Sequence, residues 1–388
     1  MQHDDRPDLL SMTPSELRQY CQSTGLPVFR AKQIFSWLHR GCQYEEMTDL
    51  PHALRVRLQT EAPLRFPTIA QKLISATDGT VKYIFRLHDG EIIESVVMQY
   101  HHGTTICISS QVGCRMGCRF CASTLHGKVR DLAPSELLGQ ILIAAKDLQK
   151  RIDGVVLMGI GEPLDNYENV LRFLHLVSDP AGVCIGLRHI SLSTCGLVDR
   201  IDALAQQALG ITLSVSLHAP SDALRSEIMP INRKWNIAAL LDATVRYFEK
   251  TGRRVSFEYT LIHGKNDTLA QAKALGDTLL RHTGRRMPLH VNLIPVNPVA
   301  ERGFSPAQPA RIKAFAAALQ ERGITATVRR RLGQDIDAAC GQLRARFLQK
   351  QQKATPQPVA PPAAPFPPKT KQRCIDGKKG DRRCDITE

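Results

Sequence analysis

The first 75 residues carry apolar positions at a helical spacing. Residues 13–16 read Thr-Pro-Ser-Glu, a capping box with proline at the first helical position, and predict a helix that ends at Gly25. Helical spacing returns over residues 29–41, and Pro51 is expected to open a third helix. The pattern predicts a small helical accessory domain over residues 1–75, with RNA as its expected ligand.

Short apolar runs replace this pattern over residues 76–350. Two β-type runs, 81–87 and 91–99, are joined by a His-Asp-Gly turn that is typical of a hairpin. Short strands then alternate with helical stretches such as 134–150 and 238–251. Repeated strand–helix units predict an α/β fold with a parallel sheet, open or closed into a barrel, and an active site at the carboxyl ends of the strands. The expected strands are residues 104–109, 154–158, 189–194, 211–217, 255–262, 289–295 and 324–329.

The end of the chain, residues 351–388, has a different composition. Residues 353–388 hold seven prolines, eight basic residues and few large apolar ones. Such a segment cannot bury enough surface to offset its chain entropy, so a disordered basic tail is predicted. Cys374 and Cys384 lie in it without further ligands nearby, which does not favour a metal site there.

Composition and charge narrow the class of protein. The chain has 388 residues, 43% of them hydrophobic, and no apolar run approaches the roughly 20 residues of a membrane-spanning helix. The acidic N-terminus lacks the apolar stretch of a signal peptide, so a cytoplasmic protein without membrane contact is predicted. The formal net charge is +14, of which +10 falls on residues 71–352, and this favours a polyanionic partner.

Cysteine usage is the strongest chemical signal. Eleven cysteines at uneven spacing favour metal binding or catalysis over a disulfide framework. Cys114, Cys118 and Cys121 form a CxxxCxxC loop directly after an expected strand. Three thiolates in so short a loop predict a 4Fe–4S cluster that keeps one iron free for a substrate or cofactor. A structural zinc site would need a fourth ligand, and His126 is the histidine close enough in the sequence to supply it.

Polar residues follow several of the expected strands. Residues 159–163 read Gly-Ile-Gly-Glu-Pro; the glycines let the backbone approach a ligand, and the carboxylate can accept a hydrogen bond from an ammonium group. Similar polar groups end three later strands, and strand ends of a parallel sheet converge on one pocket. The residues expected to line it are Gly161, Glu162, Ser193, Ser216, Leu217, His218 and Asn297.

These motifs resemble those of a known enzyme family. The CxxxCxxC loop is similar to that of the radical S-adenosylmethionine (SAM) superfamily. Further segments narrow the resemblance to the RlmN/Cfr family, which methylates adenine carbons in RNA, and it spans about residues 10–350. The segments are ISSQVGC at 108–114, GEPL at 161–164, SLHAP at 216–220, MPIN at 229–232 and DIDAACGQL at 335–343, the last being the most specific.

The resemblance implies a partial (β/α) radical-SAM barrel, a 4Fe–4S cluster on the three loop cysteines, and SAM at the strand-end residues. It also implies a two-thiol mechanism, because C2 and C8 of adenine are poor nucleophiles. Cys340 matches the cysteine that a first SAM methylates, and Cys107 matches the cysteine that releases the product by disulfide exchange. Glu94 matches the base that accepts the ring proton. On the residues alone, Glu94 is an ordinary strand carboxylate and Cys107 a buried apolar residue.

The partners also follow from the resemblance. RNA is the expected substrate, with one adenine of 23S ribosomal RNA as the target and transfer RNA as a further one. The target base must leave its stack to reach the cluster. C2 is preferred over C8 because housekeeping members of the family modify C2. An electron donor such as flavodoxin or ferredoxin and a monomeric state are expected.

Two other functions stay open on the residues alone. One is a radical SAM enzyme acting on a protein or small molecule, for which Cys340 and Cys107 would be dispensable. The other is a non-enzymatic RNA-binding protein with a structural zinc site, which would be colourless. The remaining cysteines of the folded part are expected to be structural: Cys21, Cys42, Cys184 and Cys195, the last at a position where the family often carries serine.

Overall fold

The computed structural model describes residues 6–284, 286–299 and 301–336 of the chain. All of these described residues belong to one compact unit. Outside the described residues lie Cys340, Cys374, Cys384 and the tail predicted over residues 351–388.

Three short helices form the N-terminal part, as the sequence predicts. The predicted capping box is present: the Thr13 side chain accepts from the Glu16 amide at 3.3 Å, and the Glu16 carboxylate accepts from the Thr13 amide at 2.8 Å. Gly25, with φ of 72°, follows the first helix. The helices are α1 (Pro14–Ser23), α2 (Arg30–Leu38) and α3 (His52–Glu61), with single 3-10 turns at Leu9–Ser11 and Tyr44–Glu46.

Ten strands form one sheet, in the order β1-β2-β3-β4-β7-β8-β9-β10-β11-β12. Strands β1 to β4 pair antiparallel, and the pairs from β4 through β12 are parallel. Within the part of the chain that the structure describes, β1 and β12 do not pair, so the barrel is partial. The strands are β1 (Thr68–Ile74), β2 (Val81–Arg86), β3 (Ile92–Tyr100), β4 (Gly103–Cys107), β7 (Gly154–Leu157), β8 (Ile190–Thr194), β9 (Thr212–Ser216), β10 (Val255–Leu261), β11 (His290–Pro295) and β12 (Thr325–Val328).

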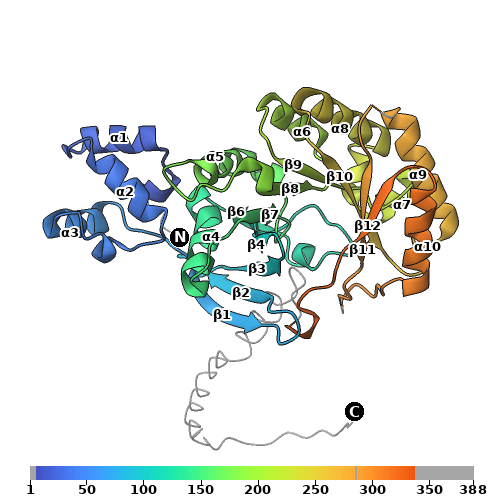
Figure 1. Cartoon of the computed structure of the whole chain (residues 1–388), viewed down its shortest axis with the longest axis horizontal. Coiled ribbons are helices and arrows are strands. Elements are labelled where there is room, and N and C mark those ends of the chain that lie inside the picture. The colour runs from blue at the N-terminus through green and yellow to red at the C-terminus, as the bar shows by residue number, and fades with distance from the viewer. Residues whose placement is uncertain (1–5, 285, 300, 337–388) are drawn as a thin grey trace, which may run out of the picture. The chain divides into compact units, whose positions relative to one another are not determined.

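Helices between the parallel strands lie on the outer side of the curved sheet (Figure 1). The two predicted helices 134–150 and 238–251 are confirmed, with ends shifted by no more than two residues. The apolar residues of the parallel strands form one continuous core with these helices. The helices are α4 (Pro134–Leu148), α5 (Tyr167–Ser178), α6 (Val198–Gln206), α7 (Asp222–Ile228), α8 (Ile237–Thr251), α9 (Leu269–Thr283) and α10 (Pro309–Gln320).

The hydrophobic pattern missed three strands. Strand β1 lies at the edge of the sheet within the stretch assigned to helices, and its residues are half-exposed or exposed without a clear alternation. The other two, β5 (Gln111–Gly113) and β6 (Lys128–Asp131), form a separate two-stranded ribbon too short to show a period. This ribbon matters because it carries the cysteine loop.

Candidate active site

The cysteine loop begins with Cys114, directly after β5 ends at Gly113. The chain leaves β4, forms β5, passes through residues 114–121 and returns as β6. The Cys114 amide donates to the Gly127 carbonyl at 2.9 Å, and the Cys121 amide donates to the Cys118 carbonyl at 3.1 Å. Gly113 makes the entry possible: its φ is 77°, and a Cβ there would lie 1.9 Å from the Gly127 oxygen.

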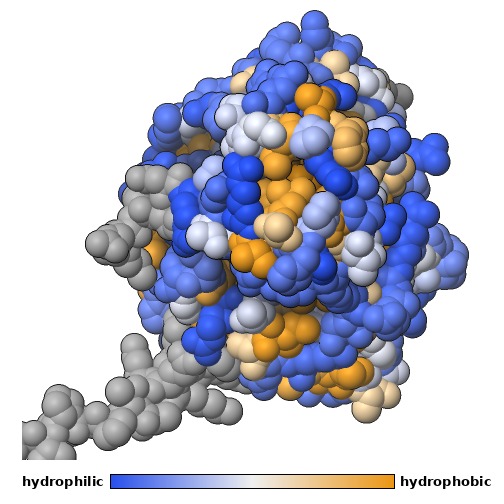
Figure 2. Space-filling view, turned by 90° about the vertical axis from the view of Figure 1, so that its left-hand side faces the viewer, coloured by the Kyte–Doolittle hydropathy of each residue, from blue (hydrophilic) through white to orange (hydrophobic). Residues whose placement is uncertain are grey.

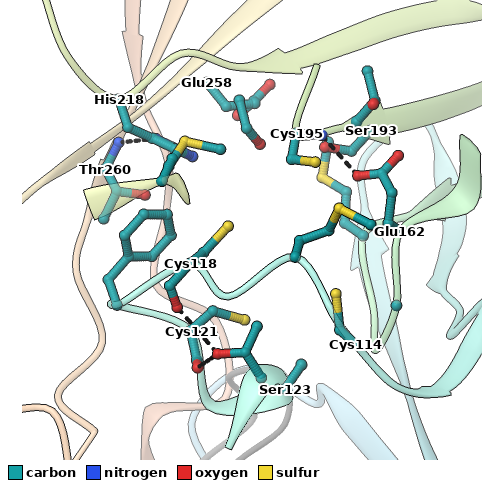
Figure 3. Close-up of a pocket in the computed structure, with 18 of the residues that line it drawn as sticks. Cys114, Cys118, Cys121, Ser123, Glu162, Ser193, Cys195, His218, Glu258 and Thr260 are labelled. Atoms are coloured by element: carbon teal, nitrogen blue, oxygen red, sulfur yellow. Dashed lines mark hydrogen bonds between the residues drawn. The ribbon is translucent and has the colours of Figure 1, made fainter. Parts of the chain in front are cut away.

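The three cysteines line one pocket and direct their sulfur atoms into it (Figure 3). Cys114 and Cys118 are buried, and Cys121 is half-buried. Burial raises the pKa of the Cys114 thiol to about 12 and raises the pKa of the Cys118 thiol well above its ordinary value. Thiols of this kind stay protonated until a bound metal displaces their protons.

The arrangement of the thiols fits a cluster rather than a single metal ion. In the described ranges, no three His, Cys, Asp or Glu residues stand close enough together to hold one ion. The three thiols nevertheless share one pocket wall. An iron–sulfur cubane is wider than one ion and takes a separate thiolate at each of three irons, which suits this spacing.

Glu162 also lines the pocket and is held in place by backbone amides. Its side chain is buried, and its two carboxylate oxygens accept from the amides of Leu164 at 3.1 Å and Cys195 at 2.7 Å. Burial is the largest influence on the carboxyl group and raises its pKa, while the two amide donors oppose that rise. The carboxylate also lines the pocket, where it can accept from a ligand's ammonium.

The glycines before Glu162 serve the chain itself. Gly159 would bring a Cβ to 2.6 Å from the Ile108 oxygen, and Gly161, with φ of 111°, would bring one to 2.7 Å from Ser110 and Gln111. The sequence analysis assigned these glycines to a close approach between the backbone and a ligand. In the structure, the backbone at Gly159 and Gly161 closely approaches residues 108–111, which lead into the cysteine loop. Gly161 also lines the pocket.

His218 lines the pocket in a constrained conformation, with φ of 57°. Its Nδ1 accepts from the Thr260 amide at 2.8 Å, which places the proton of the neutral ring on Nε2. Burial, reinforced by the charge of Arg225, lowers the pKa of His218 to about 3. The ring of Phe120 meets it edge-on at 4.8 Å between centroids. His218 therefore offers a neutral N–H donor.

Arg225 is a site residue that sequence reasoning missed. It is fully buried on α7, and its guanidinium donates to the carbonyls of Leu217 at 3.1 Å, Cys195 at 2.8 Å and Ser216 at 2.9 Å. A further bond runs to Asn232 at 2.9 Å. Arg225 thus ties together the ends of β8 and β9. Nothing in the sequence around Arg225 distinguishes it from an ordinary helical residue. Its partner Asn232 belongs to the MPIN segment at 229–232.

The other predicted ligand-binding residues divide into two groups. Ser193 and Ser216 line the pocket, and so does Glu258, which was not predicted. Burial raises the pKa of Glu258, while Arg329 nearby opposes the rise. Leu217 is buried in the main core, and Asn297 is exposed beyond the end of β11. Neither of these last two side chains is among the residues that line the pocket.

The two predicted catalytic residues of the described chain, Cys107 and Glu94, lie on the inner face of the sheet. Cys107, 3% exposed, is paired with Val96 of β3 on one side and with Val156 of β7 on the other. Glu94 lies two residues before Val96 and is also buried. Met158 packs in the same cluster as Cys107 and lines the cysteine pocket as well. The structure therefore brings Cys107 beside the pocket.

The segment that leads toward Cys340 packs against the apolar cluster that contains Cys107. Leu332 and Ile336 are the residues of this segment that pack against the cluster. Asp335 accepts from the Ser75 hydroxyl at 2.7 Å and from the Ala76 amide at 2.9 Å. The described residues thus end four positions before Cys340, at the apolar cluster that contains Cys107.

Comparison with known proteins assigns the family. Residues 108–272 match the model of the radical SAM superfamily, and residues 7–64 match the ribosomal RNA large subunit methyltransferase N-terminal domain. A "probable dual-specificity RNA methyltransferase RlmN" from Alkaliphilus oremlandii is 50% identical over 88% of this chain and 98% of its own. The chain belongs to the RlmN family. An RlmN protein of the same description from Clostridium perfringens is 48% identical over 88% of this chain and 97% of its own.

A solved structure agrees with this RlmN assignment. A radical SAM methyltransferase from Sphaerobacter thermophilus is 42% identical and superposes with a TM-score of 0.82, covering 86% of this chain and 98% of that one. The chain is a radical SAM RNA methyltransferase that uses a 4Fe–4S cluster and SAM. The family assignment excludes both alternative functions: a radical SAM enzyme that acts on a protein or small molecule, and a non-enzymatic RNA-binding protein with a structural zinc site. None of the helices in the described part is long and apolar enough to cross a membrane.

Proposed function

We propose that the enzyme methylates an adenine carbon, C2 in preference to C8, in 23S ribosomal RNA and in transfer RNA, through an S-methylated Cys340. The observation that carries the proposal is the placement of Cys107: it lies beside the cysteine pocket, in an apolar cluster against which the segment that leads to Cys340 packs. A methyl carrier on Cys340 and a resolving thiol on Cys107 need such proximity. The relatives' printed name, a dual-specificity RNA methyltransferase, supports two RNA targets.

The protein's thiols carry the methyl group. Cys340 first takes a methyl from one SAM as a thioether. When bound, a cluster held by Cys114, Cys118 and Cys121, together with a second SAM, would supply the one-electron chemistry: abstraction of a hydrogen atom from the Cys340 methyl group and uptake of one electron after the addition. The methylene on the Cys340 sulfur then forms a carbon–carbon bond with the adenine ring, which links protein and RNA covalently.

Release needs both Cys107 and a base. The Cys107 thiolate attacks the Cys340 sulfur; a disulfide forms, the sulfur–methylene bond breaks, and its electron pair stays on carbon, which takes up a proton. Glu94 accepts the proton of the ring carbon. Two electrons from a reductase such as flavodoxin or ferredoxin then reduce the disulfide for the next turnover.

The N-terminal helices carry features suited to RNA, and we include them in the proposal as an RNA-contacting domain. Figure 2 shows this side as a hydrophilic surface interrupted by an apolar strip. Among the exposed large apolar side chains of the described residues, Val28, Phe29 and Val56 belong to this part. Arg30 stands over the Phe29 ring at 4.8 Å, an arrangement on which an unstacked base can pack.

RNA from a strain that lacks the gene tests the proposal. Nucleosides from its 23S and transfer RNA, compared by mass spectrometry with those of the parent strain, are expected to lack 2-methyladenosine in both. A plasmid-borne wild-type gene should restore the nucleoside, and a Cys340→Ala gene should not. Loss of 8-methyladenosine instead, or restoration by Cys340→Ala, would contradict the proposal.

A further inference from the structure

A buried ion pair lies next to the proposed base. Lys82 of β2 and Glu94 of β3 meet at 2.9 Å between Nζ and a carboxylate oxygen, and their side chains are 0% and 2% exposed. The strand register pairs Lys82 with Val96 and Glu94 with Ile84, so the two charges sit diagonally on one face. Lysine is almost never buried to this extent.

Stability alone does not account for such a pair. Removing two charges from water costs about as much as their attraction returns, and apolar side chains of similar volume commonly stabilise a protein as well or better. The position of the pair gives a different reason. Val96 lies opposite Lys82 on one side and opposite Cys107 on the other, so the ammonium and the thiol lie in one row across β2, β3 and β4.

We propose that Lys82 is a positioning residue that keeps Glu94 ionised and directed toward the Cys107 side of the pocket. This inference rests on the proposed role of Glu94 as the acceptor of the ring proton. A buried carboxylate without a counter-charge is favoured as the neutral acid, which cannot accept a proton. With the Lys82 ammonium beside it, Glu94 is a carboxylate before it accepts the ring proton and a neutral acid afterwards. Lys82 stays protonated throughout this step.

Substitution of Lys82 separates this role from a structural one. In Lys82→Met, iron content and methylation of Cys340, read by intact mass, are expected to match wild type, because both precede the proton transfer. Methylation of RNA should fall by about a hundredfold or more, the usual contribution of a general base. In Lys82→Ala, ethylamine should restore at least about a tenth of the lost rate, and ethanol, which fills the same space without charge, should not. Equal rescue by both compounds would overturn the proposal.

A double-variant cycle covers the case in which single variants fold poorly. Lys82→Met/Glu94→Gln removes both charges, and it should be no slower than Glu94→Gln alone, because Lys82 acts through Glu94. Independent losses that multiply would overturn the inference. Its failure is distinct from that of the proposed function: a wild-type rate in Glu94→Gln would remove Glu94 as the base, whereas a wild-type rate in Lys82→Met alone would remove only the part assigned to Lys82.

Discussion

Arg225 shows how a single buried side chain fixes the geometry of the pocket. Its guanidinium donates to the carbonyls of Ser216 and Leu217 at the end of β9, and to the carbonyl of Cys195, which follows β8. Burial lowers the pKa of this group below its ordinary value. A residue placed in this way sets the distance between Cys195, whose amide holds Glu162, and Ser216.

Replacing Arg225 should therefore be costly. Arg225→Met leaves several buried carbonyls without a donor, and we expect the free energy of unfolding to fall by at least about 3 kcal/mol in urea titration. Arg246→Met is the matched control, because Arg246 pairs with Asp202 on the surface, with side chains 51% and 39% exposed. That change should cost less than about 1 kcal/mol. Equal losses would show that Arg225 does not organise the site.

At the scale of elements, the turn between β1 and β2 anchors the segment that precedes Cys340. Asp335 accepts hydrogen bonds from Ser75 and Ala76 of this turn, and the Gly333 amide donates to Asp78 at 2.8 Å. The antiparallel strands β1 and β2 thus do more than extend the sheet, because their turn holds residues 333–335 near the apolar cluster that contains Cys107.

Asp335→Ala should loosen that anchor without touching the cluster. We expect iron content to stay at the wild-type value and the RNA methylation rate to fall roughly tenfold or more, because the carrier thiol loses its orientation. Gln334→Ala is the control, since Gln334 is exposed and, within the described residues, its side chain donates to the nearby Arg331 carbonyl. A rate unchanged in Asp335→Ala would show that the anchor does not position Cys340.

The contact of α2 with the barrel contains a buried histidine that predicts a pH dependence. His39 stacks on Phe35 at 3.9 Å, neither ring nitrogen has a hydrogen-bond partner among the described residues, and a Cβ on Gly182 would lie 2.3 Å from it. Burial lowers the pKa of His39 from 6.5 to about 4. The folded state therefore binds fewer protons than the unfolded state between these values.

The free energy of unfolding should be unaffected by His39 above pH 6.5 and should fall as the pH drops toward 4. The loss amounts to about 3 kcal/mol at the lower end. Burial also lowers the pKa of His218 and His290, so those residues act in the same direction. The difference between wild type and His39→Leu across this pH range isolates the effect of His39. A difference that is constant with pH would contradict it.

At the scale of the whole molecule, the excess of positive charge predicts how RNA is held. The chain carries +14 in total, and the predicted tail contributes +4 of it. Ending the chain at Lys350 should leave iron content and the rate at saturating RNA unchanged. RNA affinity should fall more at low salt than at high salt, and the slope of log affinity against log salt should become shallower. Loss of iron on truncation would contradict this division of the chain.

The sequence allowed prediction of features that are local in the chain. Cys114, Cys118 and Cys121 and the strand-end turn at Glu162 lie within short motifs, so the sequence allowed them to be predicted as site residues. Lys82 and Arg225 appear in the sequence as ordinary charges, because their burial depends on strands and helices that pack from distant parts of the chain. Strand β1 was missed for a related reason: an edge strand has no fully buried face to impose a period.

The central claim is that two thiols, Cys340 and Cys107, pass the methyl group to RNA, and one measurement tests it directly. Cys107→Ala should methylate its own Cys340 and attack the base but lack the thiol for release. A covalent protein–RNA species should therefore accumulate, run slowly on a denaturing gel and collapse on nuclease treatment. Cys107→Ala/Cys340→Ala should give no such species. Normal turnover by Cys107→Ala, with no trapped adduct, would contradict the two-thiol account.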